Sequence, residues 1–376
     1  MCRRSEMHSL RCRLPKVIRI TEGAAVRQTN KEDSARGRAG RFSPFAVIVS
    51  GIYAIMLRMS TEKIVDVVIP SYYPGKRLIE ILELLTRQTV PIRCIRIINT
   101  EEEGFLRLLR QQKLTQKELL ALAPSLRIRH ISSSEFDHGA TRNQGFLECA
   151  GADYVLTMTQ DALPAGVRLV EELLRPFSEN ERLAVSYARQ LPNPGATAEE
   201  RLSREFNYPA KSCIKSWEDR GHLGIKAFFC SNVCAMYRLD RWMARGGFPE
   251  RAIFNEDMIY ACHALQAGDQ ICYAAEATVY HSHDYCAGQQ FHRNFDLGVS
   301  QAQNPDVFAD LPAEGEGMRY VRAVAEQLCR EKRTGQIPGF LARCAARLAG
   351  YRLGKSYQRL PKGFVRWCSS NRTYWG

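Results

Sequence analysis

Residues 64–99 read IVDVVIPSYYPGKRLIEILELLTRQTVPIRCIRIIN and contain three segments that decide the fold. The apolar run at 64–70 predicts a buried strand that Pro70 stops, and IRCIRIIN at 92–99 predicts a second strand. Between them, residues 75–88 place apolar side chains at helical spacing. This order predicts two parallel strands joined by a crossover helix.

The same alternation continues as far as residue 190. Further strands are predicted at 127–132, 154–160 and 182–190, and helices at 105–112, 117–123, 139–150 and 166–177. We therefore predict an α/β fold with a mainly parallel sheet covered by helices on both faces. In such sheets ligands bind beyond the carboxyl ends of the strands. The polar residues at those ends are Ser71, Asn99, Thr100, Glu101, Gln160 and Asp161.

The net charge of +13 is unevenly distributed along the 376 residues. Residues 1–58 carry a net charge of +8 and residues 330–376 a net charge of +10, so residues 59–329 carry −5. The mildly acidic body argues against a nucleic-acid-binding protein. The two basic ends predict contact with anionic surfaces.

The 13 cysteines are scattered without a CxxC pair or a regular framework. An odd number with irregular spacing argues against a secreted, disulfide-stabilised protein. We interpret them as reduced thiols of a cytosolic protein, most of which fill the core.

The first 58 residues allow two interpretations. Residues 1–41 show no sustained period and are predicted to be disordered, whereas residues 42–57 form an apolar stretch slightly short for a transmembrane helix. If this stretch spans a membrane, the preceding basic residues favour a cytosolic amino terminus, which places the rest of the chain outside the cytosol. The alternative is that the natural chain begins at Met59 and that the upstream part is an over-extended translation.

Gln160 and Asp161 end the predicted strand at 154–160. A carboxylate at this place can hold a divalent cation, with phosphate and water filling its other positions. The alternative is an aspartate that caps the next helix. We expect that helix to begin near Pro164 or Ala165, so its cap would lie later in the sequence.

The stretch FDHGATRNQG at 136–145 predicts a polar turn before a helix. Asp137, His138 and Gly139 form the turn, and the first helical turn carries Arg142 and Asn143. Helix amino termini and arginine side chains both suit phosphate oxygens. The alternative is an ordinary capped helix with a solvated Arg142.

Glu256 and Asp257 open the helix predicted from FNEDMIYACHALQAG at 254–268. The helix dipole by itself favours acidic residues there. The residues that follow give the helix an apolar face, so the acidic pair is expected where a buried helix meets a pocket. A carboxylate in that position can serve as a general base.

His281 and His283 alternate along the extended segment VYHSHDY at 279–285. Alternation predicts that they point to opposite faces, so that at most one of them faces the same metal as Asp161 and the other is structural. A zinc site is not predicted, because no further His or Cys lies at ligand spacing.

These motifs occur in the order typical of family 2 glycosyltransferases, and the chain resembles the bacterial rhamnosyltransferase-like branch of that family. The resemblance spans residues 63–300 and rests on VVIPSYYPG (67–75), FDHGATRNQG, MTQDALP (158–164), FCSNVCAMYR (229–238), FNEDMIYACHALQAG, VYHSHDY and QQFHRNFDLG (289–298). It implies a GT-A fold, which is a Rossmann-like nucleotide-binding fold. It also implies an inverting enzyme that uses a dTDP-deoxysugar or UDP-sugar donor.

The resemblance also implies roles for individual residues. Asp257 is the expected catalytic base, with Glu256 as its acidic neighbour. Asp161 is the expected metal ligand for Mg²⁺ or Mn²⁺, completed by a histidine, His283 in preference to His281. The expected donor-binding residues are Pro70, Ser71, Tyr72, Asn99, Glu101, Asp137, His138, Arg142, Asn143 and Gln160, and those on the acceptor or diphosphate side are Gln290 and Arg293.

In the implied mechanism, the metal and Arg142 neutralise the leaving nucleoside diphosphate while Asp257 takes the proton of an acceptor hydroxyl. The chain departs from the family pattern at two places. At the end of the second strand, residues 97–104 read IINTEEEG, where the family often has an acidic residue and a Ser-Gly run. Which nucleotide base the donor carries therefore stays open. The DxD-type motif is reduced to Gln160, Asp161 and Ala162, which leaves one carboxylate for the metal.

Residues 339–360 predict a basic amphipathic helix that carries Arg343, Arg347, Arg352 and Lys355. Such a helix either lies on an anionic bilayer surface or packs on the body with a solvated basic face. The predicted organisation is a leading region at 1–58, a GT-A domain at 59–300 and a helical basic region at 301–376.

We therefore predict a cytoplasmic, metal-dependent glycosyltransferase of cell-surface polysaccharide synthesis, acting on a glycan or lipid-linked acceptor. If the basic helix at 339–360 lies on an anionic bilayer, we also expect peripheral contact with the inner face of the cell membrane. The rival functions are a sugar-nucleotide hydrolase or nucleotidyltransferase, and a catalytically silent sugar-nucleotide-binding protein. Asp257 argues against the silent protein, and the lack of a basic, glycine-rich loop argues against the nucleotidyltransferase.

Overall fold

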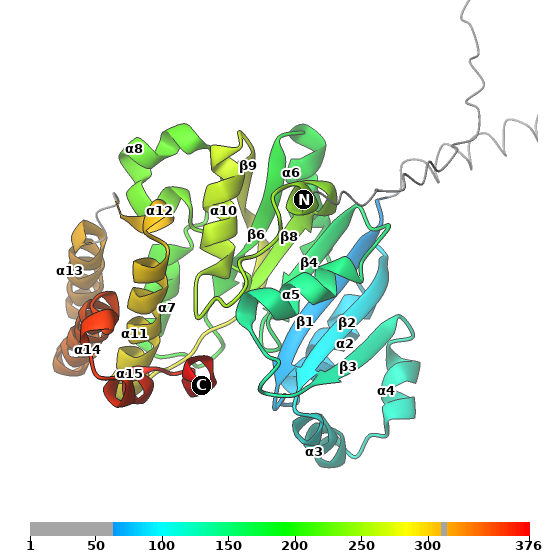
Figure 1. Ribbon diagram of the computed structural model, residues 1–376, viewed down its shortest axis with the longest axis horizontal. Coiled ribbons are helices and arrows are strands. Elements are labelled where there is room, and N and C mark those ends of the chain that lie inside the picture. The colour runs from blue at the N-terminus through cyan, green and yellow to red at the C-terminus, as the bar shows by residue number, and fades with distance from the viewer. Residues whose placement is uncertain (1–62, 310–313) are drawn as a thin grey trace, which may run out of the picture. The chain divides into compact units, whose positions relative to one another are not determined.

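Strand β1 (Val65–Tyr72), helix α2 (Arg77–Thr86) and strand β2 (Ile92–Thr100) form the predicted crossover unit (Figure 1). β1 and β2 are parallel, with Ser71 opposite Asn99. β1 carries branched apolar side chains on both faces because both faces of the sheet are covered. The computed structural model describes residues 63–309 and 314–376, so the predictions for residues 1–58 lie outside the described residues.

The next elements complete the first half of the sheet. They are α3 (Glu102–Gln112), α4 (Gln116–Leu122), β3 (Leu126–Ile131), α5 (His138–Leu147) and β4 (Tyr154–Met158). The strands lie in the order β3-β2-β1-β4 and all pair in parallel. The carboxyl ends of these strands therefore meet at one edge, as the alternating pattern predicted.

The second half of the sheet is mixed. It contains β5 (Leu163–Pro164), α6 (Leu169–Glu179), β6 (Leu183–Leu191), α7 (Ala198–Asn207), β7 (Cys213–Lys215), α8 (Arg220–Leu223), β8 (Cys234–Arg238), α9 (Leu239–Ala244), α10 (Glu256–Gln266) and β9 (Gln270–Tyr280). β9 runs parallel to β6, but β8 lies between β4 and β6 and is antiparallel to both. The short strands β5 and β7 are antiparallel to β9.

The prediction of a mainly parallel sheet thus holds for the first half and for the β6–β9 pair, and β8 departs from it. β8 begins at the edge where β6 ends, which the hydrogen bond between Gln190 and Ser231 marks. A parallel strand would need a crossover back to the other edge. Pro164 also differs from its prediction, because it belongs to β5 and α6 begins only at Leu169.

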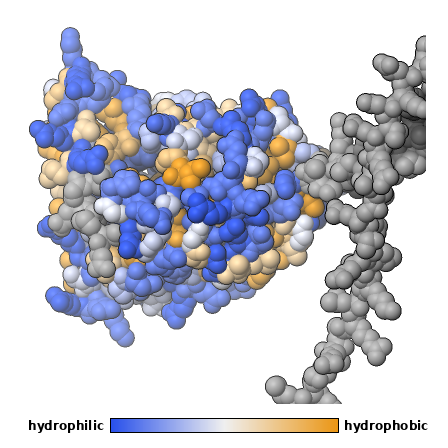
Figure 2. Space-filling view, turned by 90° about the horizontal axis from the view of Figure 1, so that it is seen from above, coloured by the Kyte–Doolittle hydropathy of each residue, from blue (hydrophilic) through white to orange (hydrophobic). Residues whose placement is uncertain are grey.

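Helices cover both faces of the sheet, as predicted. Val67 of β1 joins one core cluster, with side chains of α2, α3 and α6, and Val68 joins the other, with side chains of α5, α9 and α10. Neighbouring strand residues point to opposite faces, so these clusters are the two layers of the core. Seen from the end where β1 begins, hydrophilic residues predominate and hydrophobic ones form small groups (Figure 2).

The carboxyl-terminal helices pack onto this body. They are α11 (Ala287–Gln303), α12 (Pro305–Phe308), α13 (Glu314–Arg330), α14 (Ile337–Lys355) and α15 (Lys362–Cys368). α11 runs across the boundary predicted at residue 300, and the described residues belong to one compact unit. Within the described residues, no helix combines the length and apolar character needed to cross a bilayer.

Glycines let α11 and α14 approach closely. A Cβ atom placed on Gly354 would lie 2.1 Å from the carbonyl oxygen of Phe295, and one on Gly350 would lie 2.2 Å from that of Phe291. Gly298 on α11 meets α14 in the same way. The two helix backbones are therefore in direct contact, which no larger residue permits without moving a helix.

We expect Gly354→Ala to lower the free energy of unfolding by about 2 kcal/mol, because the added methyl group forces α14 away from α11. Gly317→Ala in α13 is the matched control, since open space surrounds Gly317. Alanine there gains up to about 1 kcal/mol of helix propensity. Urea unfolding of both variants measures the difference, and equal midpoints would contradict the direct helix contact.

Candidate active site

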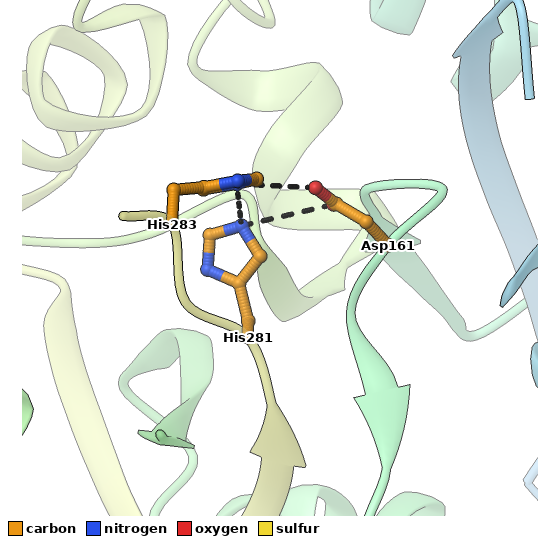
Figure 3. A group of neighbouring side chains, drawn as sticks. All are labelled: Asp161, His281 and His283. Carbon is orange, nitrogen blue, oxygen red and sulfur yellow. Dashed lines mark hydrogen bonds and ion pairs between the residues drawn. The ribbon is translucent and has the colours of Figure 1, made fainter. Parts of the chain in front are cut away.

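Asp161, His281 and His283 converge at the carboxyl edge of the sheet, with their side chains pointing toward one another (Figure 3). Asp161 lies in the turn after β4, and the histidines follow β9. The two segments meet because β5 pairs with β9, with Leu163 opposite Tyr280. Asp161 carboxylate oxygens lie 3.1 Å from Nε2 of His283 and 3.7 Å from Nε2 of His281. The two Nε2 atoms are 3.0 Å apart.

The prediction that at most one histidine faces Asp161 is wrong. It assumed that the strand continues through His283, whereas β9 ends at Tyr280 and the next residues are irregular. Once the strand ends, alternation no longer separates positions 281 and 283. His281 is buried and His283 is half-buried, and both imidazoles face Asp161.

Gln190, at the end of β6, fixes the proton position on His281. Its Oε1 atom accepts a hydrogen bond from Nη1 of Arg204 at 2.5 Å and lies 2.9 Å from Nδ1 of His281. A guanidinium can only donate, so the atom that faces His281 is the amide oxygen and Nδ1 must carry the proton. The amide nitrogen donates to Tyr208 and Ser231. Nε2 of His281 is therefore unprotonated, and it lies between Nε2 of His283 at 3.0 Å and a carboxylate oxygen of Asp161 at 3.7 Å.

The protonation states of this cluster suit metal binding. Burial lowers the pKa of His281 to about 3, so its imidazole is neutral at physiological pH. Burial alone would raise the pKa of Asp161, but the hydrogen bond from His283 and the proximity of His281 outweigh it and lower that pKa. Neutral imidazole and ionised carboxylate are the forms that coordinate a cation.

The donor set fits a divalent transition metal. The candidate ligand atoms of Asp161, His281 and His283 all lie within 4.8 Å of one another. Imidazole nitrogens with one carboxylate suit Mn²⁺ better than Mg²⁺, which prefers oxygen ligands and retains water. Gln190 supplies the second hydrogen bond that metal-binding histidines commonly make through their other ring nitrogen.

The side-chain amide of Gln160 makes two hydrogen bonds with the backbone of Tyr72 at the end of β1. Its amide nitrogen donates to the carbonyl oxygen of Tyr72, and its amide oxygen accepts from the Tyr72 backbone N–H, both at 2.9 Å. A carboxylate could not make this pair, because it has no N–H to donate. The amide next to Asp161 thus joins the turn that carries Asp161 to the end of β1.

Glu256 opens α10, as predicted, and is held in a buried ion pair. Its Oε1 atom lies 3.1 Å from Nη1 of Arg142 and accepts from Nδ2 of Asn232 at 3.1 Å. Burial alone would raise the pKa of Glu256, but the charge of Arg142 outweighs it and lowers the pKa. Glu256 is therefore a fixed negative charge.

Asp257 lies beside this charge and is half-buried. It accepts hydrogen bonds from the backbone N–H groups of Asn232 at 2.9 Å and Met258 at 2.8 Å. Burial, followed by the negative charge of Glu256, raises the pKa of Asp257 to about 7. A carboxylate with a pKa near neutrality is well matched to proton transfer.

The sequence matches known proteins as well. A family model described as "Glycosyl transferase family 2" matches residues 66–240. The O-antigen chain rhamnosyltransferase WbaN of Salmonella anatum is 42% identical over 246 residues, which are 65% of this chain and 78% of that protein. The O-antigen chain rhamnosyltransferase RfbN of Salmonella typhimurium strain LT2 is 35% identical over 315 residues, which are 83% of this chain and 96% of that protein. The chain belongs to glycosyltransferase family 2.

Two solved structures are similar to this family 2 glycosyltransferase at low sequence identity. A mannosyltransferase from Pyrobaculum calidifontis, in complex with GDP-Man and Mn²⁺, has a TM-score of 0.48 and 13% identity, covering 88% of this chain and 95% of that one. TarS residues 1–349 of S. aureus, in complex with UDP, has a TM-score of 0.43 and 14% identity, covering 79% and 91%. Family membership and the described sheet confirm the predicted α/β fold of GT-A type.

The predicted nucleoside-side residues of this family 2 glycosyltransferase lie together at the ends of β1 and β2. Ser71 donates to Oδ1 of Asn99, and Nδ2 of Asn99 donates to the carbonyl oxygen of Glu101. The Glu101 carboxylate accepts from the backbone N–H of Ser133. These polar groups form hydrogen bonds within the protein. The side chain of Tyr72, two residues after Pro70, is by contrast 55% exposed to solvent. Their contact with a donor stays a prediction.

The turn before α5 has structural contacts that the sequence did not show. Asp137 caps the helix by accepting from the N–H groups of Gly139 and Ala140, as the alternative interpretation expected. Arg142 is buried against Glu256 and is not solvated. Asn143 uses both ends of its amide on the backbone of Phe248. Contacts of Asp137, Arg142 and Asn143 with a donor stay predictions. Contact of His138 with a donor also stays a prediction, and burial lowers the pKa of its imidazole.

Arg293 of α11 contacts one aromatic ring near His283 and another near the acidic pair Glu256 and Asp257. Its guanidinium lies 4.9 Å from the ring centroid of Tyr285 and 5.5 Å from that of Phe254. Tyr285 stacks on the ring of His283, and Phe254 precedes the acidic pair. Arg293 therefore lies between the loop that carries His283 and Tyr285 and the loop that leads into α10. Gln290, one turn earlier on α11, is buried.

Sequence reasoning missed three residues that support the site. Gln190 and Arg204 orient His281, and Asn232 holds both members of the acidic pair. The sequence could have pointed to Gln190, because this polar residue ends the apolar strand predicted at 182–190. It pointed less clearly to Asn232, which lies within the motif at 229–238. Nothing in the sequence pointed to Arg204, because its role depends on how α7 packs.

Proposed function

We propose that this glycosyltransferase transfers rhamnose or another deoxysugar from a nucleoside diphosphate donor to a hydroxyl group, with inversion at the anomeric carbon. The acceptor is a glycan or lipid-linked glycan in cell-surface polysaccharide synthesis. The observation that carries the proposal is Asp257, a carboxylate with a raised pKa, held at the start of α10 beside the fixed charge of Glu256. The rhamnosyltransferases at 42% and 35% identity support the sugar class.

Asp257 is the proposed general base. Its two backbone hydrogen bonds hold the carboxylate in place, and its pKa allows it to accept a proton from the acceptor hydroxyl as that oxygen attacks the sugar. The bond from the anomeric carbon to the diphosphate oxygen breaks on the opposite face, which gives inversion. One displacement needs no covalent enzyme nucleophile, so no Ser or Cys is assigned such a role.

Asp161, His281 and His283 are the residues that would hold a divalent cation. When bound, the cation supplies positive charge to stabilise the departing nucleoside diphosphate. The protein's own contribution is to keep His281 in the tautomer with an unprotonated Nε2, through Gln190 and Arg204. Tyr285 fixes the ring plane of His283 by stacking on it.

The proposed function is tested by incubating the full chain with dTDP-rhamnose and a panel of UDP-sugars, each with Mn²⁺, Mg²⁺ or EDTA and with lipid-linked glycan acceptors. We expect transfer of a deoxysugar that depends on an acceptor and on the metal. Release of free sugar without an acceptor would instead identify a hydrolase. Donor binding with no turnover under any condition would identify a silent binding protein.

The pH profile of the reaction should follow Asp257. Because the base must be deprotonated to accept a proton, we expect kcat/KM to rise with pH and to level off above an apparent pKa of about 7. Initial rates at subsaturating acceptor concentration over the pH range from weakly acid to weakly alkaline measure this limb. A profile that is flat across neutral pH would argue against Asp257 as the base.

A further inference from the structure

Lys215 is a buried charge that the proposed mechanism does not use. It ends β7, and only 3% of its surface is exposed. Its Nζ atom donates to the hydroxyl oxygen of Tyr187 at 3.2 Å, to the carbonyl oxygen of Lys226 at 3.2 Å and to the carbonyl oxygen of Phe229. An ammonium group has three N–H bonds, so these three oxygens use all of its donors.

The groups around Lys215 keep its ammonium group charged and in place. Nζ lies 5.0 Å from the ring centroid of Tyr187 and 6.0 Å from that of Phe229, and aromatic rings attract a cation. Burial lowers the pKa of Lys215 to about 8, so the protonated form still predominates at neutral pH. Burial also raises the pKa of the neighbouring thiols, which are therefore neutral. The titratable groups that face Lys215 are the hydroxyl group of Tyr187, the carboxylate of Asp219 and the thiols of Cys213, Cys230 and Cys272.

Phe229 begins a short irregular stretch, which we call the 229–232 segment. It lies between a 3-10 helix at Gly224–Ala227 and β8, and none of its residues belongs to a helix or a strand. Such a stretch lacks the regular backbone hydrogen bonds that fix a strand, so its position depends on contacts with side chains. Lys215 binds the carbonyl oxygen at its start, and Gln190 donates to Oγ of Ser231 at 2.9 Å.

Asn232, the last residue of the segment, contacts both members of the acidic pair. Its backbone N–H donates to the Asp257 carboxylate at 2.9 Å, and its Nδ2 atom donates to Glu256 at 3.1 Å. Burial and the charge of Glu256 raise the pKa of Asp257, whereas the hydrogen bond from the backbone of Asn232 lowers it. The pKa of the base therefore depends on where the 229–232 segment lies.

We propose that Lys215 is a positioning residue for the general base. It holds the first carbonyl group of the 229–232 segment, so that the backbone N–H of the last residue can donate to Asp257. The three hydrogen bonds of Lys215 go to the protein itself, so it acts through the segment and not on a substrate. The inference rests on the proposed function, in which Asp257 takes the proton of the acceptor hydroxyl.

Lys215→Met tests the proposal, because it removes the charge and its N–H donors while keeping a long side chain. The segment should then shift, weaken the hydrogen bond to Asp257 and raise the pKa of the base. A hydrogen bond to a charged group corresponds to about one pKa unit or more. We therefore expect the acidic limb of the kcat/KM profile to move up by about one pH unit, with about a fivefold loss at neutral pH. This loss should recover at higher pH, whereas a loss of folded protein would not.

Hydrogen–deuterium exchange with mass spectrometry measures the segment without any turnover. The peptide that contains residues 229–232 should exchange faster in Lys215→Met than in the parent chain, because its anchor is lost. The parent chain gives a second reading that needs no variant. An uncharged amine has two N–H bonds for three oxygens, so the protection of this peptide, corrected for the intrinsic exchange rate, should fall as the pH rises past about 8.

Two variants serve as matched controls. Lys211→Met removes an exposed lysine that precedes β7. Leu119→Ala creates a cavity under α4, which precedes β3 at the opposite end of the sheet from the pair of β7 and β9. The urea midpoint of Leu119→Ala should fall. Both controls should nevertheless keep the acidic limb of the parent chain and its rate of exchange at residues 229–232.

Three results would overturn the proposal. They are an acidic limb of Lys215→Met that coincides with that of the parent chain, an equal shift of that limb in Leu119→Ala, and unchanged exchange of the peptide in Lys215→Met. If Lys215→Met does not fold, constant protection in the parent chain above a pH of about 8 overturns the proposal. If the parent chain transfers no sugar, the proposed function fails instead, and the exchange measurements alone decide whether Lys215 anchors the segment.

Discussion

Asp257→Asn should reduce kcat about a thousandfold while leaving the KM for the donor nearly unchanged. Asparagine keeps the shape of the side chain, but its single amide oxygen can accept only one of the two hydrogen bonds that the backbone N–H groups of Asn232 and Met258 donate to the Asp257 carboxylate. It cannot take a proton from the acceptor hydroxyl, and the loss of a positioned general base costs about 10²- to 10⁴-fold. Steady-state kinetics with the donor found for the parent chain measures the loss.

Two further variants separate the base from its surroundings. Glu83→Gln removes an exposed carboxylate on α2 and should leave the kinetics unchanged. Glu256→Gln removes the charge that helps to raise the pKa of Asp257, so the acidic limb of the pH profile should move to lower pH. It also leaves Arg142 buried without its partner, which costs about 3 kcal/mol of stability. Transfer that survives Asp257→Asn would refute the assignment of the base.

The strands and helices up to residue 190 could be predicted because their signals are local. Apolar runs and helical spacing in residues 64–99 directly reflect burial on both faces of a parallel sheet. The same reasoning predicted that Asn99 and Asp161 would lie at one edge. It could not predict β8, because the direction of that strand depends on a reversal beside β6 and leaves no periodic pattern.

The details of the site depended on tertiary packing. The two histidines were assigned to opposite faces from their spacing, but the spacing rule ends with the strand at Tyr280. Gln160 was predicted as a donor-binding residue at the place where the DxD-type motif lacks a carboxylate, whereas its amide makes two hydrogen bonds with the backbone of Tyr72 that a carboxylate could not make. The sequence shows which residue stands at each of these positions. It does not show which residues that side chain contacts in the fold, and those contacts determine its role.

Asp161→Asn and His281→Ala should each weaken Mn²⁺ binding by about a hundredfold or more. Asp161 is the one carboxylate in the cluster, and its charge is what attracts and neutralises a divalent cation. His281 offers a nitrogen that Gln190 keeps unprotonated, so its loss removes a ligand already in the binding form. Electron paramagnetic resonance of free Mn²⁺ measures binding to each variant independently of activity. Unchanged Mn²⁺ affinity in Asp161→Asn would refute the metal site.

Gln190→Leu provides the sharper version of this prediction, because Gln190 does not belong to the candidate ligand set. Leucine removes the acceptor at Nδ1 of His281, so the ring can move its proton to Nε2 and lose the lone pair at that atom. Loss of such an outer partner weakens metal binding about 10- to 100-fold. His263→Gln, which changes a half-exposed histidine on α10, is the matched control and should bind Mn²⁺ like the parent chain. If Gln190→Leu leaves Mn²⁺ affinity intact while Asp161→Asn abolishes it, Gln190 is not what keeps Nε2 of His281 available to the cation.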